Sequence, residues 1–296
     1  MGTKVTIGLC VKNGARIVKI AFNSISVQDY PHELMKLVIV DNGSSDNTLS
    51  LARKFAQETD IKTFVTSSKA GLGAIRQIAV DNAEGDYILW VDDDLVLSKD
   101  YVRNQVEFME KNPNVGAAKG FRLKDKSHAT ISIATLSSLL DSNSQNPKVI
   151  GTGSAIFRLN ALKSIGGFDI RIKGAGEDID VSRRIRESGW GLSINNSARQ
   201  YKKDSPATLK ALWKKNLWYG YAKHFLFHKY KDQWSLIDYF PPFTLLVGFR
   251  MSCSIYRLTN MKKVFFFPCL YSFSILANYI GFIRAHLDGY GHANGN

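Results

Sequence analysis

Short apolar segments alternate with helical segments through the first 111 residues, and this alternation limits the possible folds more than any other feature. The segments expected to be strands are Val5–Val11, Leu37–Val40, Phe64–Val65 and Tyr87–Val91. The segments with helical periodicity are Ala15–Ser26, Thr48–Glu58, Gly71–Ala83 and Tyr101–Lys111. Strands separated by helices of this length predict βαβ units, so we expect an α/β chain with a mostly parallel central sheet flanked by helices.

The pattern is less regular after Val115. The elements expected there are a strand, a helix and a charged helix that ends before Gly189: Ile150–Arg158, Leu159–Ile165 and residues 178–188. The segment Ser137–Pro147 is rich in Ser, Asn and Gln, which predicts a surface loop. Because the composition changes further on, we expect an α/β domain over residues 1–205 and a helical tail over residues 206–296.

The tail combines lysines, aromatic residues and long apolar runs. Apolar side chains recur at helical spacing in its first segment: Leu209, Leu212, Trp213, Leu217, Tyr221 and Phe225. This pattern predicts a basic amphipathic helix suited to a membrane interface. Val264–Ile283 then contains twenty residues without a charge, enough to span a bilayer, although Pro268, Ser272, Ser274 and Asn278 weaken the run. Membrane contact is the favoured interpretation, and a buried pair of core helices is the alternative.

Charge and cysteine content point to an anionic partner and a reducing compartment. Lysines and arginines outnumber acids by 39 to 26, a formal charge of +13. Nucleic acid is not expected as the partner, because no nucleic-acid module accompanies the apolar tail. Cys10, Cys253 and Cys269 show no metal or disulfide spacing, and the chain enters a strand without an apolar leader. We therefore expect the cytoplasmic face of the cell membrane, with peripheral attachment or anchoring by the C-terminal hydrophobic segment.

Three consecutive acids follow the apolar run that ends at Val91. Asp92, Asp93 and Asp94 would stand at the carboxyl end of a parallel strand, where open α/β sheets bind their ligands. Because three adjacent carboxylates repel one another, we expect a cation there, and a divalent metal carrying a nucleotide diphosphate fits best. The alternatives from the triplet alone are a solvated acidic turn and a structural Ca²⁺ loop.

Other segment ends carry residues suited to a nucleotide or to catalysis. Asp41 emerges directly from the second strand and can accept hydrogen bonds from a base or from ribose hydroxyls. After the third strand, Gly71 lets the backbone approach a ligand, and Arg76 can hold a pyrophosphate or stack on a base. Glu177 and Asp178 follow a glycine turn and open the charged helix. Acids in a first turn are common dipole partners, but this pair predicts a catalytic rim with one base and one bracing residue.

Four motifs in this order resemble the family 2 glycosyltransferases, which have a GT-A fold with a Rossmann-like nucleotide-binding half. The resemblance covers roughly residues 3–225. The motifs are Val40-Asp41-Asn-Gly-Ser-Ser-Asp46, Gly71-Leu-Gly-Ala-Ile-Arg76, Val91-Asp92-Asp93-Asp94 and Gly176-Glu177-Asp178-Ile-Asp180-Val-Ser-Arg183. Each motif is loose alone, but four in order at suitable spacing are specific.

The resemblance implies a role for each matching position. Asp41 and Arg76 would grip the nucleotide. Asp92, near the ribose, and Asp94, on the metal, would form the acidic pair that holds Mg²⁺ or Mn²⁺. Asp178 would be the catalytic base, with Glu177 beside it. The remaining nucleotide-sugar-binding positions would be Val11, Asn13, Gly71 and Asp93.

Two departures from the family pattern refine this expectation. Many relatives have a histidine near the diphosphate and metal, where this chain has Tyr201-Lys-Lys-Asp204. Lys202 or Lys203 could neutralise the diphosphate instead. The Gln-x-x-Arg-Trp motif of processive relatives is also missing, and Lys214-Lys-Asn-Leu-Trp-Tyr-Gly220 stands in that region. Its absence favours transfer of a single sugar.

We therefore expect an inverting transfer of one sugar from a nucleotide-diphosphate sugar to an acceptor. The basic aromatic tail suggests a lipid-linked acceptor, such as a polyprenyl phosphate or a lipid-bound glycan. A sugar-nucleotide nucleotidyltransferase is one alternative, although Lys12-Asn-Gly-Ala-Arg16 lacks the expected glycine-rich loop. A non-catalytic membrane-bound scaffold with the same fold is another, and the intact acids at Asp92, Asp94 and Asp178 count against it.

Overall fold

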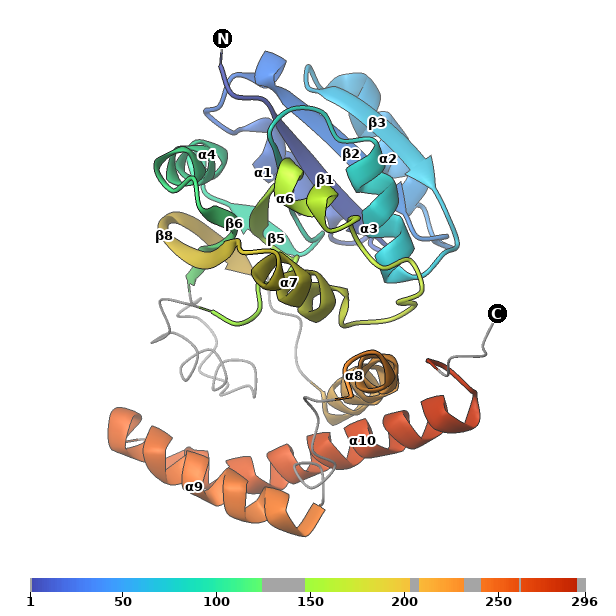
Figure 1. Cartoon of the computed structure of the whole chain (residues 1–296), viewed down its shortest axis with the longest axis vertical. Coiled ribbons are helices and arrows are strands. Elements are labelled where there is room, and N and C mark those ends of the chain that lie inside the picture. Colours follow the sequence, from blue (N-terminus) through green and yellow to red (C-terminus); the bar gives the residue numbers. More distant parts are fainter. Residues whose placement is uncertain (1, 124–146, 203–207, 232–240, 261, 292–296) are drawn as a thin grey trace. The chain divides into compact units, whose positions relative to one another are not determined.

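The computed structural model describes residues 2–123, 147–202, 208–231, 241–260 and 262–291 (Figure 1). The chain divides into two compact units. The sheet unit contains residues 1–127, 145–173 and 177–204, and the helical unit contains residues 205–296 together with two short segments. The predicted loop Ser137–Pro147 lies outside the described residues, except for Pro147.

The sheet unit is built on one sheet of eight described strands in the order β3-β2-β1-β4-β7-β6-β8-β5. The strands are β1 Val5–Val11, β2 Met35–Asp41, β3 Lys62–Ser67, β4 Tyr87–Trp90, β5 Leu95–Leu97, β6 Val115–Leu123, β7 Ala155–Arg158 and β8 Gly191–Lys202. The first four strands are parallel, as predicted, and so are β6 and β8. Strand β7 is antiparallel to both of its neighbours, and β5 is antiparallel to β8.

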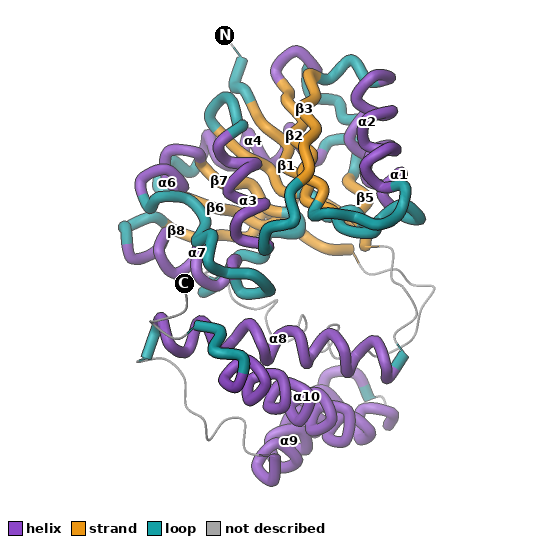
Figure 2. Tube along the Cα trace, turned by 90° about the vertical axis from the view of Figure 1, so that its right-hand side faces the viewer, coloured by secondary structure: helices purple, strands orange, loops and turns teal. Residues whose placement is uncertain are grey.

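Helices cover both faces of this sheet, as the βαβ pattern predicts. They are α1 Val18–Ser26, α2 Thr48–Glu58, α3 Leu72–Asp81, α4 Tyr101–Lys111, α6 Leu159–Ser164 and α7 Glu177–Glu187, with a 3₁₀ turn at His32–Leu34. Residues of α1, α2 and α4 pack into one core cluster, and residues of α3, α6 and α7 into another. Figure 2 shows α1 and α2 on one side of the strands and α3 on the other.

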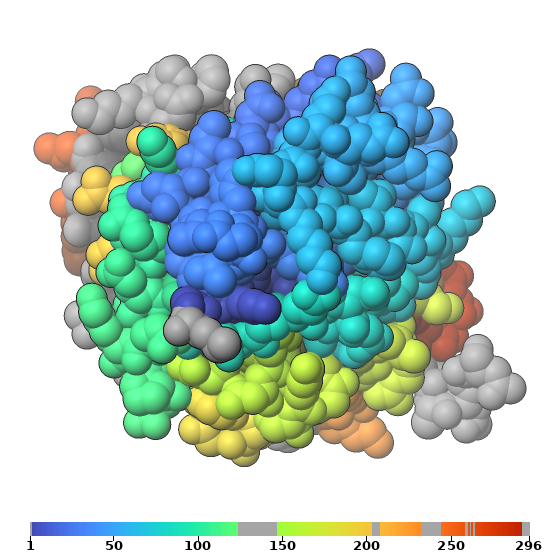
Figure 3. Space-filling model, turned by 90° about the horizontal axis from the view of Figure 1, so that it is seen from above, coloured from blue at the N-terminus to red at the C-terminus, as the bar shows by residue number. Residues whose placement is uncertain are grey.

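Alternate residues of the central strands supply the two cores. In β2, Leu37 and Ile39 join one cluster, whereas Val38 and Val40 join the other. A strand buried on both faces therefore reads as a continuous apolar run. In the space-filling view of Figure 3, the N-terminal segments adjoin the later segment after residue 147, because β7 pairs with β4 and extends the sheet.

Some predicted boundaries were wrong, each for a local reason. Helix α1 begins at Val18 rather than Ala15, because Ile17 N–H donates to the Gly14 carbonyl in a preceding turn. The strand predicted from Ile150 begins only at Ala155. Residues 151–154 form a turn before it. The charged helix was placed correctly to within one residue, and Gly189 follows it with φ of 92°.

The helical unit consists of α8 Leu209–Lys229, α9 Pro241–Thr259, a 3₁₀ turn at Lys262–Phe266 and α10 Phe267–Leu287, among the described residues. Helix α10 packs against both α8 and α9. Its crossing with α8 is close at Gly281, where a Cβ would collide with the Leu217 carbonyl. The stripe predicted on α8 is therefore partly used inside the unit, and Trp213 packs on Phe273 with ring centroids 4.9 Å apart. Leu209 stays exposed.

Within the described residues, one helical stretch, Val264–Leu287, has the length and composition to cross a membrane. Pro268 does not interrupt it, because this residue stands in the first turn of α10, where a missing N–H breaks no helical hydrogen bond. Two polar residues of the run lie inside the helical unit. Ser274 and Asn278 are buried, and Asn278 Nδ2 donates to Asn216 Oδ1 of α8 at 2.9 Å.

Candidate active site

The carboxyl ends of β1 and β2 lie side by side at the candidate site. Val11 is in register with Asp41, and Asn42 N–H donates to the Val11 carbonyl at 2.8 Å. The Val11 side chain belongs to the core and also reaches the loop after β1, since its Cγ2 lies 2.7 Å from where a Cβ of Gly14 would be. Asn13 is exposed, with φ of 53°, and its Oδ1 accepts from Ser45 N–H at 2.9 Å. These contacts join the two loops into one rim.

Asp41 is a buried carboxylate whose two oxygens differ in their hydrogen bonding. Ser44 N–H and Ser67 Oγ both donate to its Oδ2 at 3.0 Å. Its Oδ1 is equally buried and has no hydrogen-bond partner among the described residues. A buried acceptor without a donor costs stability unless a ligand supplies one. This oxygen is therefore suited to an N–H or O–H donor of a bound molecule.

Arg76 of α3 is buried with its positive charge near Trp90 and Asp92. The guanidinium carbon lies 4.6 Å from the Trp90 ring centroid, and Nη2 lies 3.4 Å from Asp92 Oδ1. Two further guanidinium nitrogens, Nε and Nη1, are buried without a partner in the described structure. The cation is thus only partly satisfied by the protein.

Gly71 has a packing role that sequence reasoning did not foresee. A Cβ at this position would collide with the backbone of Lys173. The first turn of α3 donates to the same loop, because Leu72 N–H points to the Lys173 carbonyl and Gly73 N–H to the Ile172 carbonyl. Gly71 is therefore needed for α3 to approach this loop, which fixes the helix that carries Arg76.

The three acids after β4 point to different neighbours. Asp92 N–H donates to the Gly153 carbonyl at 2.9 Å, and a Cβ on Gly153 would lie 2.6 Å from Asp92 Oδ2. The glycine thus lets the turn at residues 151–154 close against Asp92. Asp93 faces the loop after β1, because its Oδ2 lies where a Cβ of Gly14 would be. Burial, followed by the charges of Asp94 and Asp92, raises the pKa of Asp93 to about 6.

Asp94 forms an ion pair with Lys202, the last residue of β8. Lys202 Nζ lies 2.8 Å from Asp94 Oδ2. The pairing of β5 with β8 places them together, since Leu95 is in register with Lys202. Asp94 Oδ1 is buried and has no partner within the described segments. Lys203, the other lysine considered from sequence, lies outside the described residues.

Glu177 and Asp178 begin α7. Glu177 is buried and accepts a hydrogen bond from Thr152 Oγ1 at 3.0 Å. Burial and the neighbouring Asp178 charge raise the pKa of Glu177 to about 7. Asp178 is half-buried, its Oδ1 accepts from Ile179 N–H at 2.8 Å, and burial raises its pKa as well. The positive charge of Arg76 lowers the pKa of both acids and so partly offsets the effect of burial.

The tertiary structure adds residues that sequence reasoning missed or used differently. Thr152 and Gly153 contact Glu177 and Asp92 from a turn, whereas Gly151–Ser154 was expected to lie on a strand beside the acid pair. Lys202 was considered as a partner for diphosphate, and the structure pairs it with Asp94. Cys10 Sγ lies 3.7 Å from the Ile75 carbonyl, and burial raises its pKa to about 11. Cys10 is therefore a neutral thiol at pH 7.

Comparisons with known proteins agree with the fold and the motifs. The family Glycosyl transferase family 2 matches residues 6–163, and Glycosyl transferase family group 2 matches residues 87–283. The poly-beta-1,6-N-acetyl-D-glucosamine synthase of Staphylococcus epidermidis is 26% identical over 244 residues, which are 77% of this chain and 56% of that protein. The chain thus spans about half the length of the curated relatives it matches first.

Solved structures share the fold at low sequence identity. The mannosyltransferase PcManGT from Pyrobaculum calidifontis, in complex with GDP-Man and Mn²⁺, aligns over 100% of this chain and 77% of its own, with a TM-score of 0.62 and 16% identity. Residues 1–349 of Staphylococcus aureus TarS, in complex with UDP-GlcNAc, align over 97% of this chain and 92% of their own, with a TM-score of 0.55 and 16% identity. These matches confirm the predicted GT-A fold. Because the first family match covers more than half of the chain, this protein belongs to the family 2 glycosyltransferases.

Proposed function

We propose that the chain transfers a single sugar, with inversion, from a nucleotide-diphosphate sugar to an acceptor. One observation supports this most strongly: buried acceptor and donor atoms lack protein partners at the end of β2, after β4 and on α3. They are Asp41 Oδ1, Asp94 Oδ1 and the Nε and Nη1 atoms of Arg76, within the described residues. A nucleotide diphosphate with a divalent cation supplies donors, negative charge and positive charge together.

The nucleotide would bind along the rim formed by β1 and β2. Asp41 Oδ1 would accept from the base or the ribose, and Asn13, exposed on the adjoining loop, would contact the same moiety. Arg76 would direct its two unpaired nitrogens toward the diphosphate. Val11 would contribute its backbone, and Gly71 would act by holding α3 in place.

The acids Asp92 and Asp94 fit a divalent metal of the Mg²⁺ or Mn²⁺ kind. Both offer carboxylate oxygens, the donors that these hard cations prefer, and Asp94 Oδ1 is buried without a protein partner among the described residues. When bound, such an ion would stabilise the negative charge that develops on the leaving diphosphate. Lys202 already neutralises Asp94 at 2.8 Å and would either share this carboxylate or turn to the diphosphate. Asp93 would shape the turn from its place against the β1 loop.

Asp178 would act as the general base toward the acceptor hydroxyl. Its raised pKa makes it a better proton acceptor than an ordinary aspartate, and the nearby Arg76 charge favours its ionised form. Glu177, fixed by Thr152, would hold the start of α7 and keep Asp178 in position. A protonated Glu177 beside an ionised Asp178 avoids the repulsion of two adjacent negative charges.

The helical unit would place the enzyme at a membrane, where a lipid-linked acceptor is found. Its polar contacts lie inside: Asn278 with Asn216, and Thr244 Oγ1 with Ser272 Oγ at 2.9 Å. Many of its exposed side chains are large and apolar: Leu245, Leu246, Val247, Phe249, Phe265, Phe266, Leu276, Ile280, Ile283 and Leu287. Polar residues inside and apolar residues outside are the arrangement that lipid favours. We propose residues 1–205 as the catalytic domain and 206–296 as the membrane-associating domain, on the cytoplasmic face.

A ligand screen followed by a transfer assay tests the proposal. UDP, GDP and their sugar derivatives should raise the melting temperature of the purified chain with Mn²⁺ or Mg²⁺, and Asp94→Asn should weaken the metal-dependent part. The stabilising nucleotide sugar should then be consumed when a polyprenyl phosphate or a lipid-linked glycan is added. Absence of stabilisation by every nucleotide diphosphate would contradict the donor site. Turnover of a nucleoside triphosphate with a sugar phosphate would instead indicate a nucleotidyltransferase.

A further inference from the structure

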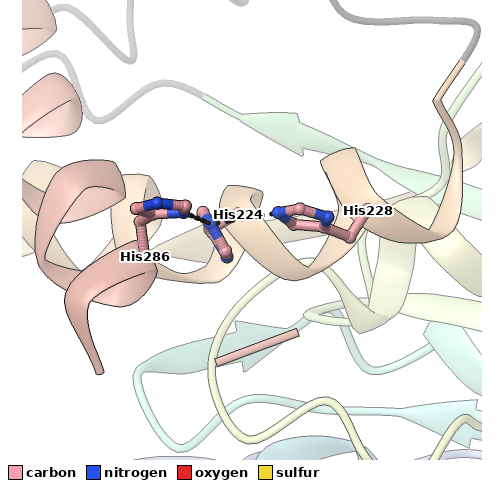
Figure 4. Close-up of side chains that lie close together, drawn as sticks. All are labelled: His224, His228 and His286. Carbon is pink, nitrogen blue, oxygen red and sulfur yellow. Dashed lines mark hydrogen bonds between the residues drawn. The ribbon is translucent and has the colours of Figure 1, made fainter. Parts of the chain in front are cut away.

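Three histidines of the helical unit gather at the point where α8 meets the end of α10. His224 and His228 are one turn apart on α8, and His286 lies in the last turn of α10. Figure 4 shows the rings in a row, with His224 between the other two. His224 Nε2 lies 3.2 Å from His286 Nδ1 and 3.2 Å from His228 Nε2. One nitrogen of each ring lies within 4.8 Å of the others.

The orientation of the central ring is fixed by a turn that follows α10. His224 Nδ1 contacts the Tyr290 carbonyl oxygen. Because a carbonyl only accepts, Nδ1 must carry the proton, and a neutral His224 then has its lone pair on Nε2. The turn is well anchored, since Gly289 has φ of 71° and Tyr290 N–H donates to the Ala285 carbonyl at 2.9 Å. The Tyr290 ring also stacks on Tyr221.

Hydrogen bonds alone do not satisfy both contacts of His224 Nε2. His224 Nε2 has one lone pair when the ring is neutral and one proton when it is charged, but two imidazole nitrogens lie at hydrogen-bond distance from it. Only one of these two contacts can then be a full hydrogen bond. A cation between the three nitrogens would accept a lone pair from each ring.

We propose that His224, His228 and His286 bind a transition-metal ion of the zinc class. Zinc–imidazole bonds are about 2.0–2.1 Å long, so two nitrogens on a tetrahedral ion are separated by about 3.3 Å. The two separations of 3.2 Å are close to this spacing. His286 is exposed and His228 is half-buried, so small rotations of these rings would bring the third separation into range. The exposed side leaves room for water as the fourth ligand.

The surroundings of the cluster match those of a histidine metal site. A ring nitrogen of a metal-bound histidine commonly donates to a backbone carbonyl, and Tyr290 supplies that acceptor for His224. Phe282 lies against the His224 ring with centroids 4.8 Å apart, and Phe227 meets the His228 ring edge-on at 5.5 Å. Imidazole ligands select zinc-class ions, whereas the carboxylates of Asp92 and Asp94 select Mg²⁺ or Mn²⁺. This site is thus chemically distinct from the proposed catalytic one.

A bound ion would clamp α10 to α8 at their contact. The ligands are separated by 62 residues in sequence, so the ion would close a long loop of chain. The i, i+4 spacing of His224 and His228 places two ligands on one helix face, and His286 supplies the cross-link. The expected consequence is a more stable helical unit, whatever the chemistry of the sheet unit.

Zinc binding by the full-length chain tests this proposal. Equilibrium dialysis with Zn²⁺ in excess Mg²⁺ should give one zinc per chain, and Co²⁺ in its place should give the visible absorption of a tetrahedral site. His286→Gln should weaken zinc binding at least about ten-fold, because even changes in the outer shell of such sites commonly cost that much. His32→Gln, a histidine on the sheet unit, is the matched control and should bind zinc as the natural chain does.

A second variant separates loss of a ligand from damage to the fold. His286→Cys keeps a metal-binding side chain, so it should retain zinc and alter the Co²⁺ spectrum through a thiolate bond. His286→Gln should keep the helical content of the natural chain, since His286 is exposed. Unchanged zinc binding in His286→Gln, or no zinc in the natural chain, would overturn the proposal. The latter result would leave a hydrogen-bonded row of histidines.

Discussion

The two units of this chain distribute polar and apolar residues in opposite ways. In the sheet unit, both faces of the central strands are apolar and buried, and the polar groups gather at the strand ends, at Asp41 and Asp92. In the helical unit, Asn278 and Ser274 are buried between helices, whereas Leu246 and Phe266 are exposed. The first pattern leaves polar groups free for a ligand at the strand ends, and the second agrees with the membrane contact proposed above.

The difference shows that hydrophobic content alone does not identify what surrounds a segment. Val5–Val11 and Phe267–Leu287 are both strongly apolar runs, but the strand is buried throughout except at Cys10. Helix α10 buries mainly its small and polar residues, such as Ala277 and Gly281. Small residues at a helix contact let backbones approach closely, as Gly281 does against Leu217.

The largest effect is expected at the strand-end site of the sheet unit. Asp178→Asn should lower the turnover of sugar transfer at least ~100-fold while nucleotide binding persists, because general-base catalysis contributes roughly 10²–10⁴-fold. Initial rates and nucleotide affinity should be measured on the same preparations. The exposed Asp60→Asn is the control and should have the rate of the natural chain. Near-normal turnover of Asp178→Asn would show that the base is elsewhere, or that the acceptor is already ionised.

The exposed apolar face of the helical unit should bind vesicles. Leu246→Glu should reduce partitioning into anionic phospholipid vesicles on the order of ten-fold, since burying a leucine side chain is worth about 1.5–3 kcal/mol. Gln57→Glu, which adds the same charge on an exposed position of α2, should leave partitioning nearly unchanged. Equal losses in the two variants would mean that charge, not apolar contact, determines attachment. Sedimentation with vesicles at low and high salt provides the measurement.

The ion pair of Lys202 with Asp94 should compete with metal binding at Asp94. Lys202→Met should raise the affinity for Mn²⁺ by several-fold in the absence of nucleotide, because a positive charge 2.8 Å from a metal ligand opposes the ion. If Lys202 also contacts the diphosphate, the same variant should bind UDP or GDP more weakly. Mn²⁺ titrations of Lys202→Met and of the control Lys62→Met, whose lysine pairs with Glu84, separate these effects. Weaker Mn²⁺ binding in Lys202→Met would contradict the competition.

The smallest effect is expected from the titration of Glu177. Its pKa is raised to about 7, so the folded chain binds a proton that the unfolded chain has released, and stability falls as pH rises from about 4.5 to 7. Glu177→Gln removes the buried charge and should raise the melting temperature at pH 8 by a few degrees. In a chain of this size each kcal/mol of added stability raises the melting temperature by about 2–4 °C. At pH 4, below both pKa values, the two chains should melt at nearly the same temperature. Thermal melts of both chains across this range provide the test, and a destabilised variant at pH 8 would show that the charge is favourably paired.

Sequence reasoning succeeded where a residue's position depends on its own segment. The strand ending at Asp41, the triplet after β4 and the helix opened by Glu177 all lie where their segments predict them. In each case a periodic run of hydrophobic residues adjoins a polar group, so the pattern can be recognised within a short stretch of sequence. The antiparallel strand β5 could not be predicted in this way, because Leu95–Leu97 is too short to show a period and its partner β8 is about 100 residues away.

The amino-acid sequence by itself determined the α/β alternation, the acids at the strand ends and the apolar tail, since these depend on composition and spacing along the chain. Only the tertiary structure decided that Lys202 pairs with Asp94, that Thr152 holds Glu177, and that the histidines of α8 meet His286. Such contacts join residues 25 to 108 positions apart. No local period encodes them, because they form only when packed elements bring distant side chains within a few ångströms of one another.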